Sequence, residues 1–406
     1  MLRSVRFEVD LDLVCHNLRV VREALAAGPT AADGRPPRIA AVLKGNGYGL
    51  GSLVLAGVLL EAGADLLAVA CLPEALELRR EYPDAPILVM GHTPAEYLGE
   101  AARARVCTTL FDLDQARALS DASRALGVRT PVHVKIDTGM NRLGIRPDAG
   151  TPKLIARMAA LPGLRLEGIF SHLALRDPAQ DTAQFQLFQR VVMAATADGV
   201  TFPLRHLCDS IGMLRYPEFR LDLVRTGAIL FGNKPLRTSG ADALDIRVPF
   251  ALRAQVSRLA RIGAGESVGY DETWRAPEGG AVVATVPVGY ADGYFRSLSN
   301  RAQALVRGVR APVIGLVMMD QLILDVSRVP GAAAGDEVLL LGRAGTDEVG
   351  ALELAEWAGT NRNEVISMVG RRVPRVYRRG GRAVAECDYL LDPSGRPRVL
   401  APAGAC

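Results

Sequence analysis

The sequence lacks the patterns that mark several classes of protein. No window approaches the roughly 18 uninterrupted apolar residues of a membrane-spanning helix. Residues 1–10 lack the charged-then-apolar order of an export signal, and acidic residues follow at once. The net charge of +4 is small for 406 residues and mixed along the chain. We therefore expect a cytoplasmic protein without a membrane or nucleic-acid partner.

Cysteine and histidine are scarce and scattered. The six cysteines form no Cys-x-x-Cys pair, and the five histidines show no spacing typical of zinc ligands. These residues are Cys15, Cys71, Cys107, Cys208, Cys387 and Cys406, and His16, His92, His133, His172 and His206. We expect reduced thiols and no metal site.

Nucleotide-binding and aspartic-protease signatures are also missing. The glycines after Lys44 fit neither the Rossmann spacing nor a P-loop, which ends in Gly-Lys-Ser/Thr. Asp137-Thr138-Gly139 occurs in aspartic proteases, but that chemistry needs two such carboxylates and the chain has no second one in a similar setting.

What the chain does contain is a regular alternation of strand and helix signals from residue 12 to about 232. Short apolar strand-like runs recur at 39–43, 66–70, 86–90, 106–110, 131–136, 165–171, 205–209 and 222–230. Eight strands with helical crossovers predict an α/β fold of the (β/α)8, or TIM, barrel type. A doubly wound sheet would usually have fewer strands and a glycine fingerprint after the first strand.

The rhythm changes after a linker-like stretch at 233–244. Strand and turn signals follow, with two short helical pieces at 351–358 and 362–369. We therefore expect a barrel domain over 1–240 and a mostly β C-terminal domain over 241–406. The first strand, at about 4–10, could pack on the second domain instead of the barrel.

Lys44 is the first candidate for chemistry. It ends a buried apolar run, Ile39 to Leu43, and alternating glycines follow it. An arbitrary lysine at a strand end is usually a surface charge. A desolvated lysine, however, loses its proton and can form a Schiff base.

Other polar residues follow later strands of the expected barrel, whose carboxyl ends share one face. They are Arg142, His172, Asp209, Ser210, Arg225 and Gly227. Ser210 opens a short helix after strand 7 and Gly227 lies at strand 8, where barrels often bind phosphate. A lysine and a phosphate cradle suggest pyridoxal phosphate, although a lysine-dependent sugar-phosphate aldolase would use the same two features.

The assembled motifs resemble those of the alanine racemase family across nearly the whole chain. The family's pyridoxal lysine segment matches 43–51, and its Lys-x-Asp-Thr-Gly-Met-x-Arg-Leu-Gly segment matches 135–144. Further matches are Val-Arg-x-Gly at 224–227, Gly-Tyr-Ala-Asp-Gly at 289–293, Met-Asp-Gln at 319–321 and Arg-Val-Pro-Arg-Val-Tyr at 372–377. Several ordered motifs over two domains are a specific signal.

This resemblance implies a homodimeric, pyridoxal-phosphate-dependent amino-acid racemase with active sites shared between chains. Lys44 would hold the cofactor and act as a base on one face of the substrate Cα. Tyr290 of the partner subunit would act on the opposite face, and Met319 of the partner subunit would bind the substrate carboxylate through its backbone amide. D-alanine for cell-wall peptide is the product that the family implies.

The resemblance also implies roles for the remaining site residues. Arg225 would face the pyridine nitrogen, and His172 would pack beside the ring. Arg142 would bind the cofactor's phenolic oxygen and the substrate, and Lys135 matches a lysine that some members carry as a carbamate. The phosphate would be held by Tyr48, Ser210 and Gly227, with Asn363 close to both phosphate and substrate.

The sequence departs from the family pattern at Asp209, Asn141, Met318 and Asn363, where Asn, Gly, Cys and Tyr are usual. Asparagine at 363 is shorter than tyrosine and can hydrogen-bond a hydroxyl, so the site could accept serine or prefer it. Alternatives are a serine or broad-specificity racemase, a fold-related pyridoxal decarboxylase, or a pyridoxal-binding protein without catalysis.

Overall fold

The protein is described here by a computed structural model that covers residues 2–234, 243–345 and 347–401. Two compact units are built from discontinuous stretches of the chain. The barrel unit comprises Cys15–Gly45 and Ala56–Ile246, and the β unit comprises Met1–Val14, Asn46–Leu55 and Arg247–Cys406. Most of the expected linker at 233–244 lies outside the described residues.

Eight strands of the barrel unit form one parallel sheet within the described residues, in the order β8-β7-β6-β5-β4-β3-β2-β9. Apolar runs bounded by turns form these strands, and most of their residues are buried on both faces. The strands are β2 (Arg38–Val42), β3 (Leu66–Val69), β4 (Ile87–Val89), β5 (Cys107–Leu110), β6 (Thr130–Lys135), β7 (Leu164–Phe170), β8 (Leu204–His206) and β9 (Leu223–Thr226).

Backbone hydrogen bonds close this sheet into a barrel. The amide of Asp222 donates to the carbonyl of Arg205 at 3.0 Å, and the amide of Arg225 donates to the carbonyl of Cys208 at 3.0 Å. Both bonds join the β9 segment to the β8 segment, which are the two ends of the sheet order. The predicted (β/α)8 barrel is therefore confirmed.

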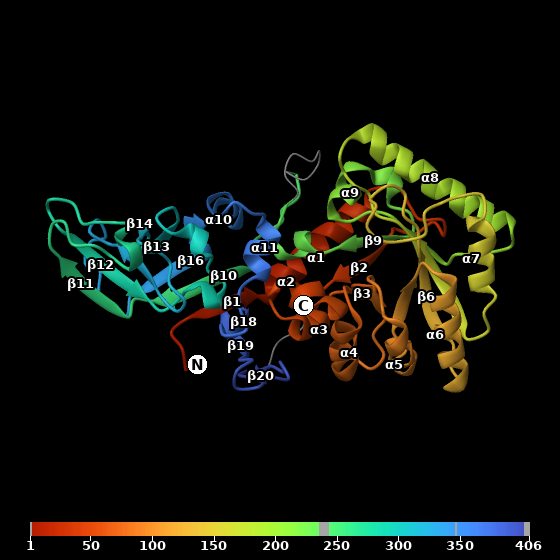
Figure 1. Cartoon of the computed structure of the whole chain (residues 1–406), viewed down its shortest axis with the longest axis horizontal. Helices are drawn as coiled ribbons and strands as arrows, with labels where there is room; N and C mark the ends of the chain where they lie inside the picture. The colour runs from red at the N-terminus through yellow and green to blue at the C-terminus, as the bar shows by residue number, and fades with distance from the viewer. Residues whose placement is uncertain (1, 235–242, 346, 402–406) are drawn as a thin grey trace. The chain divides into compact units, whose positions relative to one another are not determined.

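Helices between successive strands cover the outside of the barrel (Figure 1). They are α1 (Leu11–Ala26), α3 (Ser52–Glu61), α4 (Leu72–Glu81), α5 (Leu98–Arg103), α6 (Leu113–Ala125), α7 (Thr151–Ala159), α8 (Pro178–Ala197) and α9 (Ser210–Arg215). One apolar core joins α6, α7 and α8 to β6 and β7, through residues such as Leu119, Ile155, Phe188 and Val134. None of the helices in the described part of the chain is long and apolar enough to cross a membrane.

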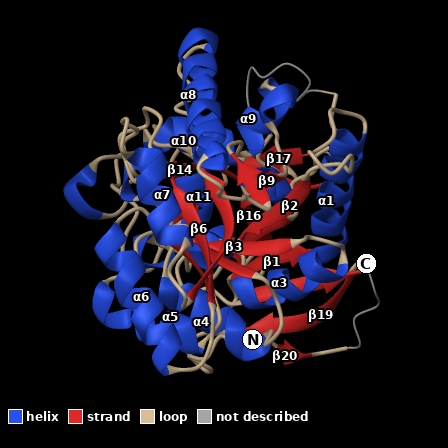
Figure 2. Ribbon diagram, turned by 90° about the vertical axis from the view of Figure 1, so that its right-hand side faces the viewer, coloured by secondary structure: helices blue, strands red, loops and turns tan. Residues whose placement is uncertain are grey.

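Within the residues described, the β unit contains one sheet of twelve strands. Figure 2 shows β1, β19 and β20 among its strands, in red. The first strand of the chain, β1 (Arg6–Asp10), lies in this sheet between β10 (Phe250–Gln255) and β18 (Arg375–Arg379). The other strands are β11 (Arg258–Ile262), β12 (Ala281–Val286), β13 (Gln303–Val306), β14 (Val309–Ile314), β15 (Leu322–Asp325), β16 (Glu337–Ala344), β17 (Asp347–Val349), β19 (Arg382–Cys387) and β20 (Arg398–Val399). The helices α10 (Ala351–Ala358) and α11 (Arg362–Ser367) complete the unit.

Some local expectations are wrong. The last barrel strand stops at Thr226, because Gly227 begins a 3-10 turn over Ala228–Phe231. The expected reduced thiols are found at Cys71, Cys107, Cys208 and Cys387, but the expectation is wrong for Cys15, which is disulfide-bonded.

Candidate active site

Lys44 begins a left-handed turn directly after β2. The turn, α2 (Lys44–Tyr48), has φ values of 64° at Gly45, 55° at Asn46, 62° at Gly47 and 55° at Tyr48. This conformation costs an L-residue roughly 1–2 kcal/mol, and glycine almost nothing. Gly45 and Gly47 therefore adopt the turn with little strain, whereas Asn46 and Tyr48 are strained.

The surroundings of Lys44 favour its neutral amine. Partial burial and the charge of Arg142 lower the pKa of Lys44, while Asp209 and Glu74 oppose the shift. Glu74 also fixes the start of the turn, because its carboxylate accepts a hydrogen bond from the Gly45 amide at 2.6 Å. A lysine with a lowered pKa is a better nucleophile and base near neutral pH.

Arg225 lies in the barrel interior with only neutral acceptors around its guanidinium. Its Nη1 donates to His206 Nδ1 at 2.8 Å, and its Nη2 lies within 3.0 Å of His172 Nδ1 and the carbonyls of Ser171 and Leu207. The side chain is 4% exposed, and burial lowers the pKa of Arg225 to about 10. It therefore stays protonated at neutral pH and can only donate.

The imidazoles beside Arg225 are held in one tautomer by this donor. Burial and the charge of Arg225 lower the pKa of both His172 and His206 well below its usual range, so both rings are neutral. Since Nδ1 accepts from arginine in each ring, the hydrogen is on Nε2. His206 Nε2 then donates to His133 Nδ1 at 2.8 Å. Arg225, His206 and His133 thus form a row of hydrogen bonds inside the barrel.

Lys135 is the second unusual amine. Its Nζ donates to the carbonyl of Ile136 at 2.9 Å and lies 5.1 Å from the centre of the Phe170 ring. Burial and the charge of Arg225 lower the pKa of Lys135 to about 7. The side chain is therefore a substantial fraction neutral at physiological pH.

The carboxylate of Asp137 stabilises the loop that carries Arg142. That carboxylate accepts hydrogen bonds from the amides of Gly139 and Asn141, each at 3.0 Å. Asn141 has a φ of 58°, a conformation that asparagine tolerates better than most residues. Arg142 is exposed at the end of this loop, and its charge acts on Lys44, Lys135 and His172.

The predicted phosphate cradle is only partly available. Ser210 begins α9 as predicted, but the carboxylate of Asp209 caps that helix and accepts from the amides of Ile211 and Gly212 at 2.9 Å each. These two amides at the start of the helix are therefore occupied by an aspartate. The Ser210 hydroxyl, which lies 3.4 Å from the Gly227 amide, is the group left beside β9.

In the β unit, two of the sequence motifs lie side by side. The amide of Tyr290 donates to the carbonyl of Met318, and the amide of Ala291 donates to the carbonyl of Met319, both at 3.0 Å. Gly289 is required there, since a Cβ would lie 2.2 Å from the Met318 oxygen. The side chains of Tyr290 and Met319 are 42% and 53% exposed.

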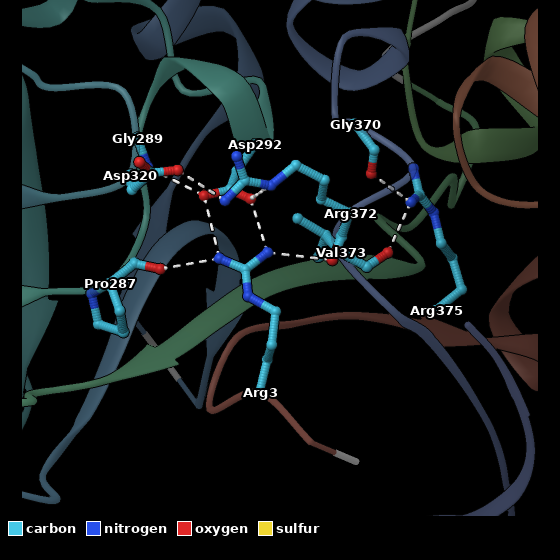
Figure 3. A network of polar contacts seen from close by, with 9 residues as sticks. All are labelled: Arg3, Pro287, Gly289, Asp292, Asp320, Gly370, Arg372, Val373 and Arg375. Carbon is cyan, nitrogen blue, oxygen red and sulfur yellow. Dashed lines mark hydrogen bonds and ion pairs between the residues drawn. The ribbon is translucent and has the colours of Figure 1, made fainter. Parts of the chain in front are cut away.

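An ion-pair network around the buried Asp292 holds the Tyr290 turn (Figure 3). Arg3 contacts both carboxylate oxygens of Asp292, at 2.7 and 3.2 Å. The same carboxylate accepts from the Gly289 amide at 3.1 Å. Arg372 lies 3.4 Å from Asp292 and 2.7 Å from Asp320, which follows Met319. The two turns that present Tyr290 and Met319 are therefore joined by four charged side chains.

Tyr48 and Asn363 also belong to the β unit. Gly49, which follows Tyr48, packs so closely on α11 that a Cβ would lie 2.7 Å from the Ile366 carbonyl oxygen. Asn363 is exposed near the start of α11. The buried Arg375 donates to the carbonyl of Gly49 at 2.9 Å, so the segment after Lys44 is anchored by the closing motif of the chain.

The sequence analysis missed several residues that shape these sites. They are His133, His206, Glu74, Arg3 and Asp292. One signal was present, because His133 and Lys135 are two residues apart on a strand and so share a face. The sequence contains no comparable signal for Arg3 and Asp292, since they meet only through tertiary contacts.

Comparisons with known proteins match nearly the whole chain. The N-terminal domain model of alanine racemase matches residues 9–235, and the C-terminal domain model matches residues 250–377. An alanine racemase of Desulfovibrio desulfuricans is 40% identical over 378 residues, which cover 92% of this chain and 98% of the relative. An alanine racemase of Desulforamulus reducens is 39% identical, with coverage of 91% and 98%.

Solved structures are similar over the same extent. Alanine racemase of Clostridium difficile 630 matches with a TM-score of 0.89 and 30% identity, over 96% of this chain and all of the other. Alanine racemase of Bacillus anthracis, solved with bound L-Ala-P, matches with a TM-score of 0.86 and 32% identity, over 97% and 99%. With both domains matched in order and at this identity, the chain belongs to the alanine racemase family.

Proposed function

We propose that this chain interconverts L- and D-alanine with pyridoxal 5'-phosphate as cofactor, and that it works as a homodimer. The observation that carries the proposal is the match of both family domains over nearly the whole chain. The relatives that support it are named alanine racemases. D-alanine for cell-wall peptide, made in the cytoplasm, is the corresponding biological role.

The residues of the barrel unit fit this cofactor chemically. Lys44, Lys135, Arg142 and Arg225 form a cationic cluster whose charges lower the pKa values of their neighbours, Lys44 and Lys135 among them. An anionic phosphate and a phenolic oxygen are groups that such a cluster stabilises. Arg225, which can only donate, suits the neutral nitrogen of a pyridine ring.

In this proposal several residues bind the cofactor. Lys44 holds the cofactor, Arg142 binds its phenolic oxygen, and Ser210 with Gly227 and Tyr48 bind its phosphate. His172 packs beside the ring. When bound, pyridoxal phosphate supplies an electron sink for the negative charge that develops at the substrate Cα.

Racemisation requires proton transfer on both faces of the substrate Cα. Lys44, with its lowered pKa, takes or returns the proton on one face. Tyr290 of the partner subunit does the same on the opposite face. The exposure of Tyr290 and Met319 supports this sharing, since large apolar or aromatic side chains on a surface are typical of an interface.

Borohydride reduction followed by peptide mapping tests the cofactor assignment. The cofactor should be found covalently attached to Lys44 after reduction of the holoenzyme. Attachment at Lys135, Lys153 or Lys234 instead, or nowhere, would contradict the assignment. Racemisation is measured on the same preparation with L-alanine.

Asn363 supports serine as a second substrate. An asparagine near the substrate can hydrogen-bond a hydroxyl, and a site that makes such a bond favours the substrate bearing the hydroxyl. We expect Asn363→Tyr to lower the ratio of kcat/KM for L-serine to that for L-alanine about 10-fold, a loss of one hydrogen bond. An unchanged ratio would remove Asn363 as the determinant of specificity.

A further inference from the structure

Three metal-ligating side chains meet in the barrel, away from Lys44. Cys107, His133 and Glu167 come from the neighbouring strands β5, β6 and β7, and their ligand atoms all lie within 4.8 Å of one another. They line a cavity of about 660 Å³. Arg38, Leu66, Ile87 and Leu204, near the first residues of four other strands, line it too, so the cavity is at the amino-terminal end of the barrel.

The ligand types are those of a zinc site. Thiolate, imidazole and carboxylate are the protein ligands of zinc, and three of them leave a fourth position for water. Cys107 and His133 are buried, and Glu167 is half-buried beside the cavity. Burial raises the pKa of the Cys107 thiol, so a cation binds by displacing its proton to solvent.

A hydrogen-bonded chain links this cluster to the other end of the barrel. His133 Nδ1 is 2.8 Å from His206 Nε2, and His206 Nδ1 is 2.8 Å from Arg225 Nη1. Since arginine only donates, His206 carries its hydrogen on Nε2 and His133 accepts at Nδ1. His133 Nε2 therefore carries the other hydrogen, and it is the nitrogen that remains for a metal ligand.

A cation on His133 Nε2 would reverse the direction of this chain. The His133 hydrogen would then be on Nδ1 and donate to His206 Nε2. His206 would keep its own hydrogen on Nδ1, where it meets the donor Nη1 of Arg225. Two donors cannot share that contact, so cation binding and the bond from Arg225 to His206 exclude each other.

We propose that Cys107, His133 and Glu167 form a site for a thiophilic divalent cation of the zinc type, and that its occupation lowers racemase activity by breaking the bond between Arg225 and His206. Cation binding is inferred from the positions of Cys107, His133 and Glu167 alone. The inhibitory half rests on the proposed function, because it assumes that Arg225 contacts the cofactor.

Within the described residues, Glu167 forms an ion pair with Arg165 on the same strand. Arg165 competes with a cation for the carboxylate and also repels it. Arg165→Gln should therefore bind the cation more tightly, whereas a cluster that serves only as a buried thiol beside an ion pair predicts no such gain.

Cobalt and zinc titrations of the holoenzyme test the site. We expect one Co²⁺ per chain with a thiolate-to-cobalt absorption band, and Cys107→Ser should lose the band and weaken Zn²⁺ binding in calorimetry at least about 10-fold. Glu167→Gln should weaken binding as well. The matched control is Cys71→Ser, which removes an exposed thiol and should bind as the parent does.

Each outcome has one meaning. Binding that survives Cys107→Ser, or that is lost in Cys71→Ser, overturns the site. Binding at Cys107 without inhibition of racemisation by Zn²⁺ overturns the coupling and leaves the site standing. Because calorimetry does not require turnover, a failure of the proposed function would leave the binding result readable.

Discussion

At the scale of single residues, burial and neighbouring charges shift the pKa values of the basic groups in the candidate site. Lys44 and Lys135 have the same chemistry in solution, but burial and neighbouring guanidinium groups lower the pKa of each in this protein. Arg225 stays charged because even its lowered pKa of about 10 is far above neutral pH. The candidate site thus combines amines with lowered pKa values and a guanidinium that stays charged.

Lys135 should be carbamylated by dissolved carbon dioxide. Only the neutral amine reacts, and the pKa of about 7 makes it abundant at neutral pH. We expect a carbamate carbon signal in NMR after incubation with ¹³C-bicarbonate, growing as pH rises through about 7. Lys135→Met should abolish the signal and Lys153→Met should keep it, whereas a signal that follows Lys153 would contradict the prediction.

At the scale of elements, the two turns that carry the proposed catalytic residues are each held by their own contacts. The left-handed turn after β2 is anchored in the β unit through Gly49 and Leu50, whose carbonyls accept from Arg375 and Tyr377. The Tyr290 turn is anchored by Asp292, whose carboxylate lies among Arg3, Arg372 and the Gly289 amide.

Gly51 should be one of the least replaceable glycines. Its φ is 105°, and a Cβ there would lie 1.8 Å from the hydroxyl of the buried Tyr377. Gly51→Ala should lower the free energy of unfolding in urea by about 2–4 kcal/mol, from backbone strain and steric overlap. Gly99→Ala is the control, because α5 has open space there, and it should stabilise by about 0.5–1 kcal/mol. Equal effects of the two substitutions would refute the packing argument.

Arg3 should act as a positioning residue for Tyr290. Arg3→Met leaves the buried Asp292 carboxylate with weaker compensation, so the turn loosens, and kcat should fall roughly 10-fold for one lost ion pair. The specific readout is the deuterium isotope effect with Cα-deuterated L- and D-alanine, which should rise for one enantiomer only.

Loss of folded enzyme alone would leave both isotope effects unchanged, and that result would sink the positioning role. Arg3→Lys should recover part of kcat, since it restores the charge without the paired hydrogen bonds. The control is Arg19→Met, which removes an exposed ion pair with Glu23 and should leave kcat and both isotope effects unchanged.

At the scale of the whole molecule, a shared site is the central expectation. The chain presents Tyr290 and Met319 on the β unit and Lys44 on the barrel unit, and each active site would take the first two from a partner. Two-fold symmetry then makes the contribution reciprocal.

Mixing two inactive variants tests this sharing. Lys44→Ala and Tyr290→Phe should each be inactive alone, but a hybrid dimer contains one site with both native residues. Random reassociation should restore about a quarter of the parent activity, because half of the dimers are hybrids with one working site each. No recovery despite hybrid formation, verified by native mass spectrometry of differently tagged chains, would mean that each chain completes its own site.

The sequence alone determined the barrel, the order of its strands and the identity of Lys44, Tyr290 and Arg225 as candidates. Apolar runs, helix periodicity and contiguous motifs are local properties, so they can be recognised in the sequence itself. The alternating glycines after Lys44 are visible in the sequence, but their left-handed conformation is known only from the structure.

Only the tertiary structure decided how distant residues act together. Arg3 meets Asp292 across the chain, Asp209 occupies amides at the start of α9, and Cys107, His133 and Glu167 converge from three strands. Proton affinities and hydrogen-bond directions depend on burial and on neighbours brought together by folding, and neither can be read along the sequence.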